Sequence, residues 1–216
     1  MNKKKYSKAE EVFNSISHGT GVIFGIVALT LLLIVAIRSG HVPSIIAFSI
    51  YGACIILMFL SSTLYHSITI EKVKKVLRVF DHSSIFLFIA GTYTPIAILV
   101  LQGSLRIVTL IGIWAIALAG IIYKVLTYGK FDKYKKISLF IYLAMGWFGI
   151  FPIKSIINNT SINFFFWILA GGLLYSLGTI FYSSKKIKFN HGIWHIFVLA
   201  ASVTHFLGIF KYIALG

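Results

Sequence analysis

The sequence is poor in charged residues, in acidic residues above all, and in cysteine. Only 12% of its 216 residues are charged, and only five are Asp or Glu. Cys54 is the single cysteine, which excludes an intramolecular disulfide and a thiolate metal cluster. So few charges beside 58% hydrophobic residues exclude an ordinary soluble domain and are typical of a membrane protein.

Long apolar stretches account for most of the chain. A helix that spans a membrane needs roughly 20 mostly apolar residues. The stretches are apolar all round, which indicates helices rather than the alternating strands of a membrane barrel. We expect seven spans, at about 19–38, 44–66, 83–102, 104–123, 137–154, 163–182 and 190–212. The predicted fold is an all-α integral membrane protein, in which one seven-transmembrane helix bundle forms a single domain over residues 1–216.

The basic residues, which give a formal net charge of +15, are unevenly distributed. Sixteen of the 20 lysines and arginines fall in four clusters, within residues 3–8, 72–78, 124–136 and 185–188. With seven crossings all four clusters share one side, and the positive-inside rule makes that side cytoplasmic. We therefore expect a plasma-membrane protein with its N-terminus in the cytoplasm and its C-terminus outside. Residues 1–18 are the expected cytoplasmic tail and helix entry, without a cleavable signal peptide. No nucleic-acid partner is expected, because membrane topology explains the charge.

Histidines gather at the predicted cytoplasmic ends of the helices. His191 and His195 are spaced i, i+4, so they project from one helical face. His66 closes the second predicted span at the same depth. Titratable side chains beside a membrane are costly and often mark a site, and imidazole is a common zinc ligand. These three histidines predict a zinc site that leaves a fourth position for water. The alternative is that the pair only hydrates the helix end.

Two other polar residues fall near these histidines. Asp81 opens the third predicted span and is the carboxylate most closely tied to an apolar run. Ser62 lies four residues before His66 and shares its helical face. We expect Asp81 to orient a ligand or handle a proton, and Ser62 to hydrogen-bond the water or a substrate carbonyl.

A third group of polar residues is expected to brace the site from behind. Glu11, Asn14 and His18 recur at i, i+3 and i+7 on one face of the first helix. A polar cap on an interfacial helix is the alternative for these three. His82 follows Asp81 and points roughly 100° away from it on a helix, so it is expected to support the site rather than bind metal.

The order of these residues along the chain resembles that of a known protein family. The strings are Glu11-x-x-Asn14-x-x-Ser17-His18, Ser62-x-x-x-His66, Phe80-Asp81-His82-Ser83-Ser84-Ile85 running into Ala90-Gly91-Thr92-Tyr93-Thr94-Pro95, and His191-x-x-x-His195. Together they resemble the hemolysin III family, the bacterial branch of the progestin and adipoQ receptor superfamily. The resemblance covers essentially the whole chain. It implies seven helices with the N-terminus inside.

The resemblance also implies a chemistry. It assigns a zinc ion near the cytoplasmic side to His66, His191 and His195, with Asp81 and Ser62 around the bound water. Superfamily relatives include alkaline ceramidases, which hydrolyse a lipid amide, whereas bacterial members were named for red-cell lysis through proposed pores.

Three functions are therefore open. The first is a zinc-dependent, ceramidase-like hydrolase of a lipid amide or ester that uses a water bound by three histidines. The others are a pore-forming cytolysin and a membrane sensor whose zinc is structural. A membrane lipid is the expected partner in the first, and a homo-oligomer is possible.

Overall fold

The computed structural model describes residues 6–131, 133–184 and 186–216. Lys3, Lys4, Lys5 and Lys185, which belong to two of the predicted basic clusters, lie outside the described residues. The described residues form helices joined by short connections and contain no β-strand. Its elements are α1 (Lys8–Ser39), α2 (Val42–Ser67), α3 (Glu71–Leu99), α4 (Gly103–Leu126), α5 (Lys135–Gly146), the 3₁₀ turn η1 (Trp147–Ile150), α6 (Ile153–Asn159), α7 (Ile162–Ser183), α8 (Asn190–Ile209) and the π-helical turn η2 (Phe210–Ala214).

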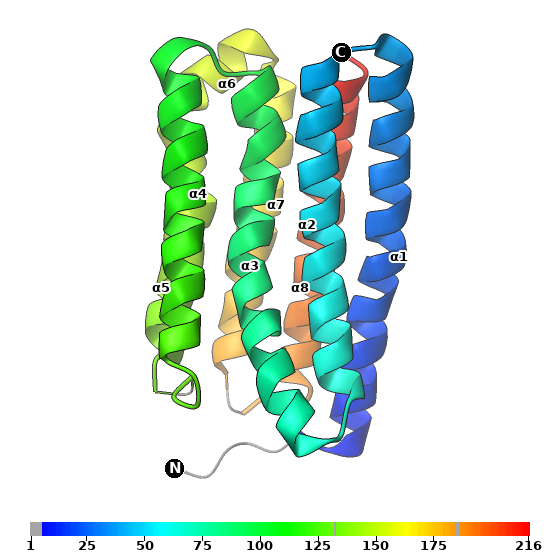
Figure 1. Ribbon diagram of the computed structural model, residues 1–216, viewed down its shortest axis with the longest axis vertical. Helices are drawn as coiled ribbons and strands as arrows, with labels where there is room; N and C mark the ends of the chain where they lie inside the picture. The colour runs from blue at the N-terminus through cyan, green and yellow to red at the C-terminus, as the bar shows by residue number, and fades with distance from the viewer. Residues whose placement is uncertain (1–5, 132, 185) are drawn as a thin grey trace.

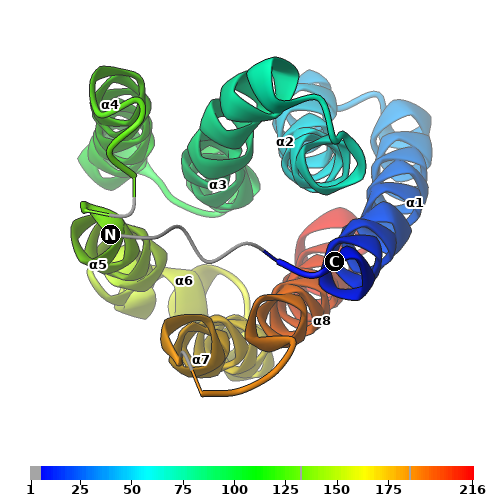
Figure 2. The same ribbon diagram turned by 90° about the horizontal axis from the view of Figure 1, so that it is seen from below.

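The helices run up and down as a bundle, with the start of α1 and the end of η2 at opposite ends (Figure 1). Seen from below, they form a ring in which α1 lies between α2 and α8, and α3 lies between α2 and α4 (Figure 2). The starts of α1, α3, α5 and α8 and the ends of α2, α4 and α7 therefore lie together at one end. We call it the lower end.

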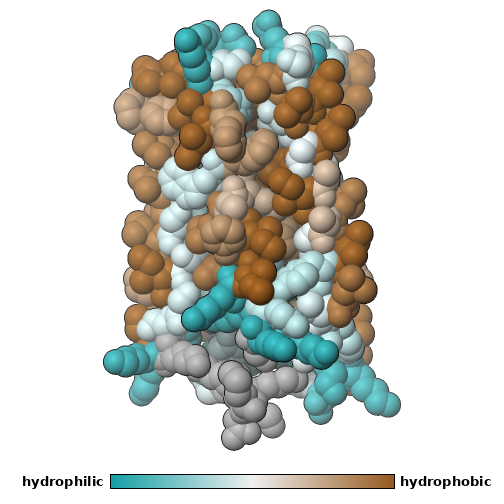
Figure 3. Space-filling view, turned by 90° about the vertical axis from the view of Figure 1, so that its left-hand side faces the viewer, coloured by the Kyte–Doolittle hydropathy of each residue, from teal (hydrophilic) through white to brown (hydrophobic). Residues whose placement is uncertain are grey.

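The prediction of an all-helical membrane protein is confirmed. Among the described residues, six helices are long and apolar enough to cross a membrane, and the bent pair Lys135–Ile150 and Ile153–Asn159 brings the number to seven if it forms one span. The face over α4 and α5 is hydrophobic along most of its length and hydrophilic at its ends (Figure 3). Ile111 of α4 is 63% exposed and Phe140 of α5 is 72% exposed. Such exposure suits a surface that contacts lipid.

The fifth predicted span differs from the structure. We expected one helix over 137–154, but the two halves of this segment meet at an angle of 49°. Gly146 ends α5, Gly149 lies in η1 just before the break, and Pro152 directly precedes α6. Glycine is a poor helix former, and proline cannot supply the N–H that would continue the helix. A hydropathy pattern registers the apolar length but not this interruption.

Two helices also begin earlier than the apolar pattern predicts. The first starts at Lys8 because Ser7 and Glu10 form a capping box, in which Ser7 Oγ accepts from Glu10 N and Glu10 Oε2 accepts from Ser7 N. The third starts at Glu71, so Asp81 and His82 lie about three turns inside α3 rather than at its start. Charged residues can extend a helix out of the membrane, and hydropathy does not count them.

Candidate metal centre

Three histidines meet at the lower end of the bundle. His66 is the penultimate residue of α2, and His191 and His195 occupy the first turns of α8. All three are buried, with exposed fractions of 3%, 7% and 0%. One ring nitrogen from each lies within 4.8 Å of the others. The structure thus brings together the three histidines that the sequence singles out.

The start of α8 is held against the end of α7. Phe189, just before the helix, adopts a left-handed backbone conformation with φ of 56°. Asn190 donates from its side-chain amide to the backbone carbonyl of Ser184 at 2.7 Å. This amide satisfies a carbonyl that α7 leaves free at its C-terminus. It also fixes where His191 enters the bundle.

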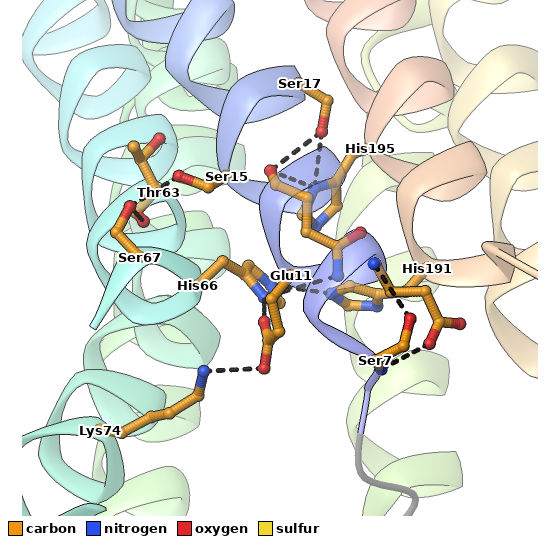
Figure 4. Close-up of polar contacts among 12 residues, drawn as sticks. Ser7, Glu11, Ser15, Ser17, Thr63, His66, Ser67, Lys74, His191 and His195 are labelled. Atoms are coloured by element: carbon orange, nitrogen blue, oxygen red, sulfur yellow. Dashed lines mark hydrogen bonds and ion pairs between the residues drawn. The ribbon is translucent and has the colours of Figure 1, made fainter. Parts of the chain in front are cut away.

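The outer nitrogen of His66 faces a carboxylate on α1. Its Nδ1 lies 2.6 Å from Glu11 Oε2, and Lys74 Nζ donates to the other oxygen, Oε1, at 2.7 Å (Figure 4). A carboxylate accepts hydrogen bonds, so Nδ1 carries the proton and neutral His66 keeps its lone pair on Nε2. A carboxylate that accepts a hydrogen bond from the non-ligating nitrogen of a histidine orients the ring and makes it a stronger metal ligand.

The outer nitrogen of His195 is held in a similar way by α1. Its Nδ1 lies 3.2 Å from the backbone carbonyl of Asn14 and 3.1 Å from Ser17 Oγ (Figure 4). The carbonyl can only accept, so Nδ1 donates and the lone pair of neutral His195 is on Nε2. That Nε2 is buried and has no hydrogen-bond partner among the described residues. An unpartnered buried lone pair is unfavourable unless something binds it.

The spacing of the inner nitrogens fits a metal ion. His66 Nε2 and His191 Nε2 are 3.2 Å apart. Two ligands at the usual zinc–nitrogen distance in a tetrahedral site are about 3.3 Å apart. Lone pairs that face each other at this distance repel unless a proton or a cation lies between them. Three neutral imidazoles also form the donor set of catalytic zinc sites with one open position.

Ser62 and Asp81 lie at the edge of the histidine cluster. Ser62 is 1% exposed and therefore buried within the bundle. The carboxyl of Asp81 approaches the Ser62 hydroxyl from α3 and interacts electrostatically with His66. Asp81 is not among the ligand atoms that share the 4.8 Å group. Both residues are therefore neighbours of the cluster rather than members of it.

The residues expected to brace the site fall in two places. Glu11 and Asn14 contact the histidines as described, and His18 stacks on His195 with ring centroids 3.4 Å apart and planes at 15°. His82 is elsewhere: its ring contacts Phe131, with centroids 5.3 Å apart, and lines a separate small cavity. Its direction on α3 turns it toward α4 and α5.

Two residues that contact the histidine cluster were not predicted from the sequence. Ser17 reaches His195, and its place three residues after Asn14 on the same helical face was a usable signal. Tyr6 stacks on His191, with ring centroids 5.3 Å apart and planes at 30°. Burial raises the pKa of the Tyr6 phenol well above its ordinary value, so the phenol is neutral near pH 7. No pattern pointed to Tyr6, because it precedes the first helix.

A large apolar cavity opens beside the cluster. It measures about 160 Å³ and is enclosed by α3, α5, α6, α7 and α8, with Phe88, Ile168 and Val198 among its lining residues. Trp194 also lines it and contacts the rings of His191 and His195, with centroid distances of 5.2 and 5.4 Å. The indole of Trp194 therefore contacts both the cavity and two of the histidine rings.

Comparison with known proteins gives a consistent result. Residues 6–206 match the family described as Haemolysin-III related. The chain is 44% identical over 203 residues to the Hemolysin-3 homolog of Bacillus subtilis (strain 168), covering 94% of each chain. It is 43% identical over 204 residues to Hemolysin-3 of Bacillus cereus, covering 94% of this chain and 92% of the relative. It is also 34% identical over 170 residues to the human monocyte to macrophage differentiation factor, covering 76% and 69%.

Proposed function

The chain belongs to the hemolysin III family, and from that premise we propose that it is a zinc-dependent hydrolase of a lipid amide or ester. One observation carries the proposal. Three buried imidazoles point nitrogens at a common place, and that place adjoins a cavity for an apolar chain. A purely structural metal does not need such a cavity beside it.

His66, His191 and His195 would hold the metal through their inner nitrogens. Glu11 and Asn14 keep two of these rings in the required tautomer by accepting from Nδ1. When bound, zinc supplies a Lewis acid for a carbonyl oxygen and lowers the pKa of a water molecule toward 7. The other requirements of hydrolysis fall to residues of this chain.

Asp81 and Ser62 are placed to serve the reaction. The Asp81 carboxylate accepts the proton of the attacking water and returns it to the leaving nitrogen or oxygen. The Ser62 hydroxyl donates to the carbonyl oxygen as negative charge develops there. The Asp81 carboxyl interacts with the same hydroxyl, so the two side chains lie close enough to act on one substrate group.

The apolar cavity would hold the acyl chain. An engineered apolar cavity of about 150 Å³ accommodates benzene, so about 160 Å³ holds a segment of several carbons. The substrate's carbonyl would then lie beside Trp194 and the histidines. A membrane lipid enters such a site without leaving the bilayer.

The membrane orientation supports the same proposal. The lower end of the bundle carries the basic clusters, including Lys72–Arg78 and Lys133–Lys136. On the positive-inside rule we propose that this end faces the cytoplasm, and we place the protein in the plasma membrane as part of the same proposal. The metal centre would then lie near the cytoplasmic leaflet.

Metal analysis and turnover test the proposal together. Purified wild type is expected to carry zinc and to release fatty acid from a short-chain ceramide or a related lipid amide. The variant His191→Ala/His195→Ala is expected to lose both. Equal and negligible zinc in the two proteins would contradict the metal site. Firm zinc binding without turnover of amides or esters would favour a sensor with a structural metal.

Cytolysis is a second candidate because two Bacillus relatives carry the name Hemolysin-3. It would require the protein, as an oligomer, to open a path through a bilayer. Dye-loaded liposomes distinguish it from the hydrolase. Leakage that persists in the double histidine variant supports a pore, whereas leakage absent from both proteins excludes it.

A further inference from the structure

His18 of α1 contacts both α2 and α8 just inside the histidine cluster. It is 1% exposed, and neither of its ring nitrogens has a hydrogen-bond partner among the described residues. A neutral imidazole carries one N–H and one lone pair, and here neither is used within the described chain. Since no such hydrogen bond holds the ring, His18 acts on its surroundings through the faces and edges of that ring.

The ring of His18 lies flat on the ring of His195. The two centroids are 3.4 Å apart, and the planes meet at 15°. Carbon atoms in van der Waals contact are about 3.5–4.0 Å apart, so rings this close overlap almost fully. Two neutral rings prefer an offset or edge-to-face arrangement to such a sandwich, because their faces carry partial charge of the same sign. The stack becomes favourable when one of the two rings is electron-poor.

A cation at the three histidines would make His195 the electron-poor ring. Its Nε2 is buried and has no hydrogen-bond partner among the described residues. When this nitrogen donates its lone pair to a cation, electron density leaves the imidazole. The electron-rich face of His18 then attracts the His195 ring, as an aromatic face attracts positive charge. Stacking by His18 and cation binding by His195 therefore favour each other.

The stack also fixes a freedom that the hydrogen bonds of His195 leave open. The backbone carbonyl of Asn14 and Ser17 Oγ both contact the same atom, Nδ1, at 3.2 and 3.1 Å. Contacts at one atom fix the position of that edge of the ring but not the tilt of its plane. The flat contact with His18 fixes the tilt, so the lone pair on Nε2 keeps one direction.

His18 is itself held in place by tight packing. Phe59 of α2 meets the His18 ring edge-on, with centroids 5.1 Å apart and planes at 87°. Phe59 is fully buried, and its ring lies against Gly21 of α1, where an added Cβ would collide with it. Trp194 of α8 contacts His18 as well, with centroids 6.4 Å apart. The His18 ring is thus rigid enough to hold a neighbouring ring.

We propose that His18 is a positioning residue for His195, which acts through the face of its ring and strengthens the binding of a cation by the three histidines. This role rests on the proposed function for the presence of a metal ion. It requires a flat aromatic ring at position 18 and does not require a ring nitrogen there. An aromatic substitute should therefore preserve metal binding, whereas an aliphatic one should weaken it.

Zinc competition with a chromogenic chelator tests this role on purified full-length protein. His18→Phe keeps a flat ring, and its zinc affinity is expected to stay close to that of wild type. His18→Leu is expected to bind zinc about 3- to 30-fold more weakly, the range that corresponds to one cation–π contact. Phe24→Leu is the matched control, because it removes a ring of the same helix that packs edge-on against Phe206. This control is expected to retain wild-type affinity.

The visible absorption spectrum of bound Co²⁺ reports the alignment of the ligands, since it depends on coordination geometry. We expect wild type, His18→Phe and Phe24→Leu to share one spectrum and His18→Leu to differ from it. If His18→Leu fails to fold, His18→Met takes its place, because its flexible chain fills the space without a flat face. If neither folds, His18→Phe still decides the question, since a loss of zinc affinity in that variant would contradict a role for the ring face.

Several results would overturn the inference. Equal zinc affinity in wild type and His18→Leu would show that the stack does not support the site. An equal loss in His18→Phe and His18→Leu would assign the effect to the nitrogens, and an equal loss in Phe24→Leu would make it a general loosening of α1. Each of these results leaves the hydrolase in place. The expected series of affinities without turnover of any lipid amide or ester would leave this inference standing and contradict the proposed function, whereas absence of metal from wild type would contradict both.

Discussion

Two clusters of polar side chains lie side by side at the lower end of an otherwise apolar bundle, and the groups behind them differ. Behind the histidine cluster stand acceptors: the carboxylate of Glu11 at His66 and the carbonyl of Asn14 at His195. Acceptors on the outer nitrogens leave lone pairs on the inner ones. This cluster therefore suits a cation.

The second cluster lines a small basic cavity between α3, α4, α5 and α7, where Arg78, Lys124 and Lys135 meet. Lys124 faces a hydroxyl and two rings, and Lys135 faces a backbone carbonyl and a ring. The buried carboxyl of Asp81 also interacts electrostatically with Lys124 and Arg78, so this cluster has counter-charge within the fold. Polar residues in a membrane protein are retained at a cost. At the histidine cluster, the acceptors at the outer nitrogens indicate that the ligand carries a positive charge.

The largest expected effect comes from removing a metal ligand. His66→Ala should reduce bound zinc from about one ion per chain to background, because two imidazoles on one helix do not complete the donor set. Inductively coupled plasma mass spectrometry of purified protein measures it. His41→Ala is the control, since His41 precedes α2 at the opposite end of the bundle and is exposed. Loss of zinc in both variants would show that the effect is general unfolding.

Removing the acceptor behind a ligand should have the next largest effect. Glu11→Gln replaces the carboxylate at His66 Nδ1 with an amide, and we expect zinc affinity to fall about 10- to 100-fold. Competition with a chromogenic chelator gives the dissociation constant. Glu71→Gln is the matched control, because the Glu71 side chain is 82% exposed and pairs only with Lys75 among described partners. An unchanged affinity in Glu11→Gln would mean that the carboxylate does not support the metal site.

A steric change tests the approach of α1 to α8. In Gly192→Ala the new methyl group would collide with the Phe13 ring and lie 3.0 Å from Asn14 Oδ1. We expect a loss of about 1–3 kcal/mol in stability, together with weaker zinc binding, because α1 carries the acceptors for two ligands. Thermal unfolding in detergent measures the first. Gly146→Ala meets nothing within 4 Å and should be neutral or mildly stabilising. Equal stability of the two variants would argue against close packing at Gly192.

The smallest effect on stability is expected in the basic cavity. Lys124→Met keeps a similar volume and removes a buried charge, so the unfolding midpoint should stay unchanged or rise. A clear drop in the midpoint would show that Lys124 serves the fold, and the contrast between the two clusters would then fail.

Much of the metal centre could be predicted from the sequence. His191 and His195 share a face because helical spacing is local, and His66 falls at the same depth because the helices alternate in direction. The position of His82 could not be predicted in the same way. Its distance from the cluster depends on how α3 is rotated against α4 and α5, and on α3 beginning at Glu71. Asp81 and His82 are adjacent on one helix, yet Asp81 lies beside the histidine cluster and His82 lines the small cavity.

The sequence by itself determined the class of the protein, because hydropathy, charge asymmetry and helical periodicity are properties of short segments. It also determined which residues could bind a metal. Only the tertiary structure decided which nitrogens face inward, because the partners that set the tautomers, Glu11 and Asn14, come from α1, far from α2 and α8 in the chain. The tertiary structure alone also determined where the two cavities lie. A cavity is the space that side chains of several helices fail to fill, and no local pattern records that.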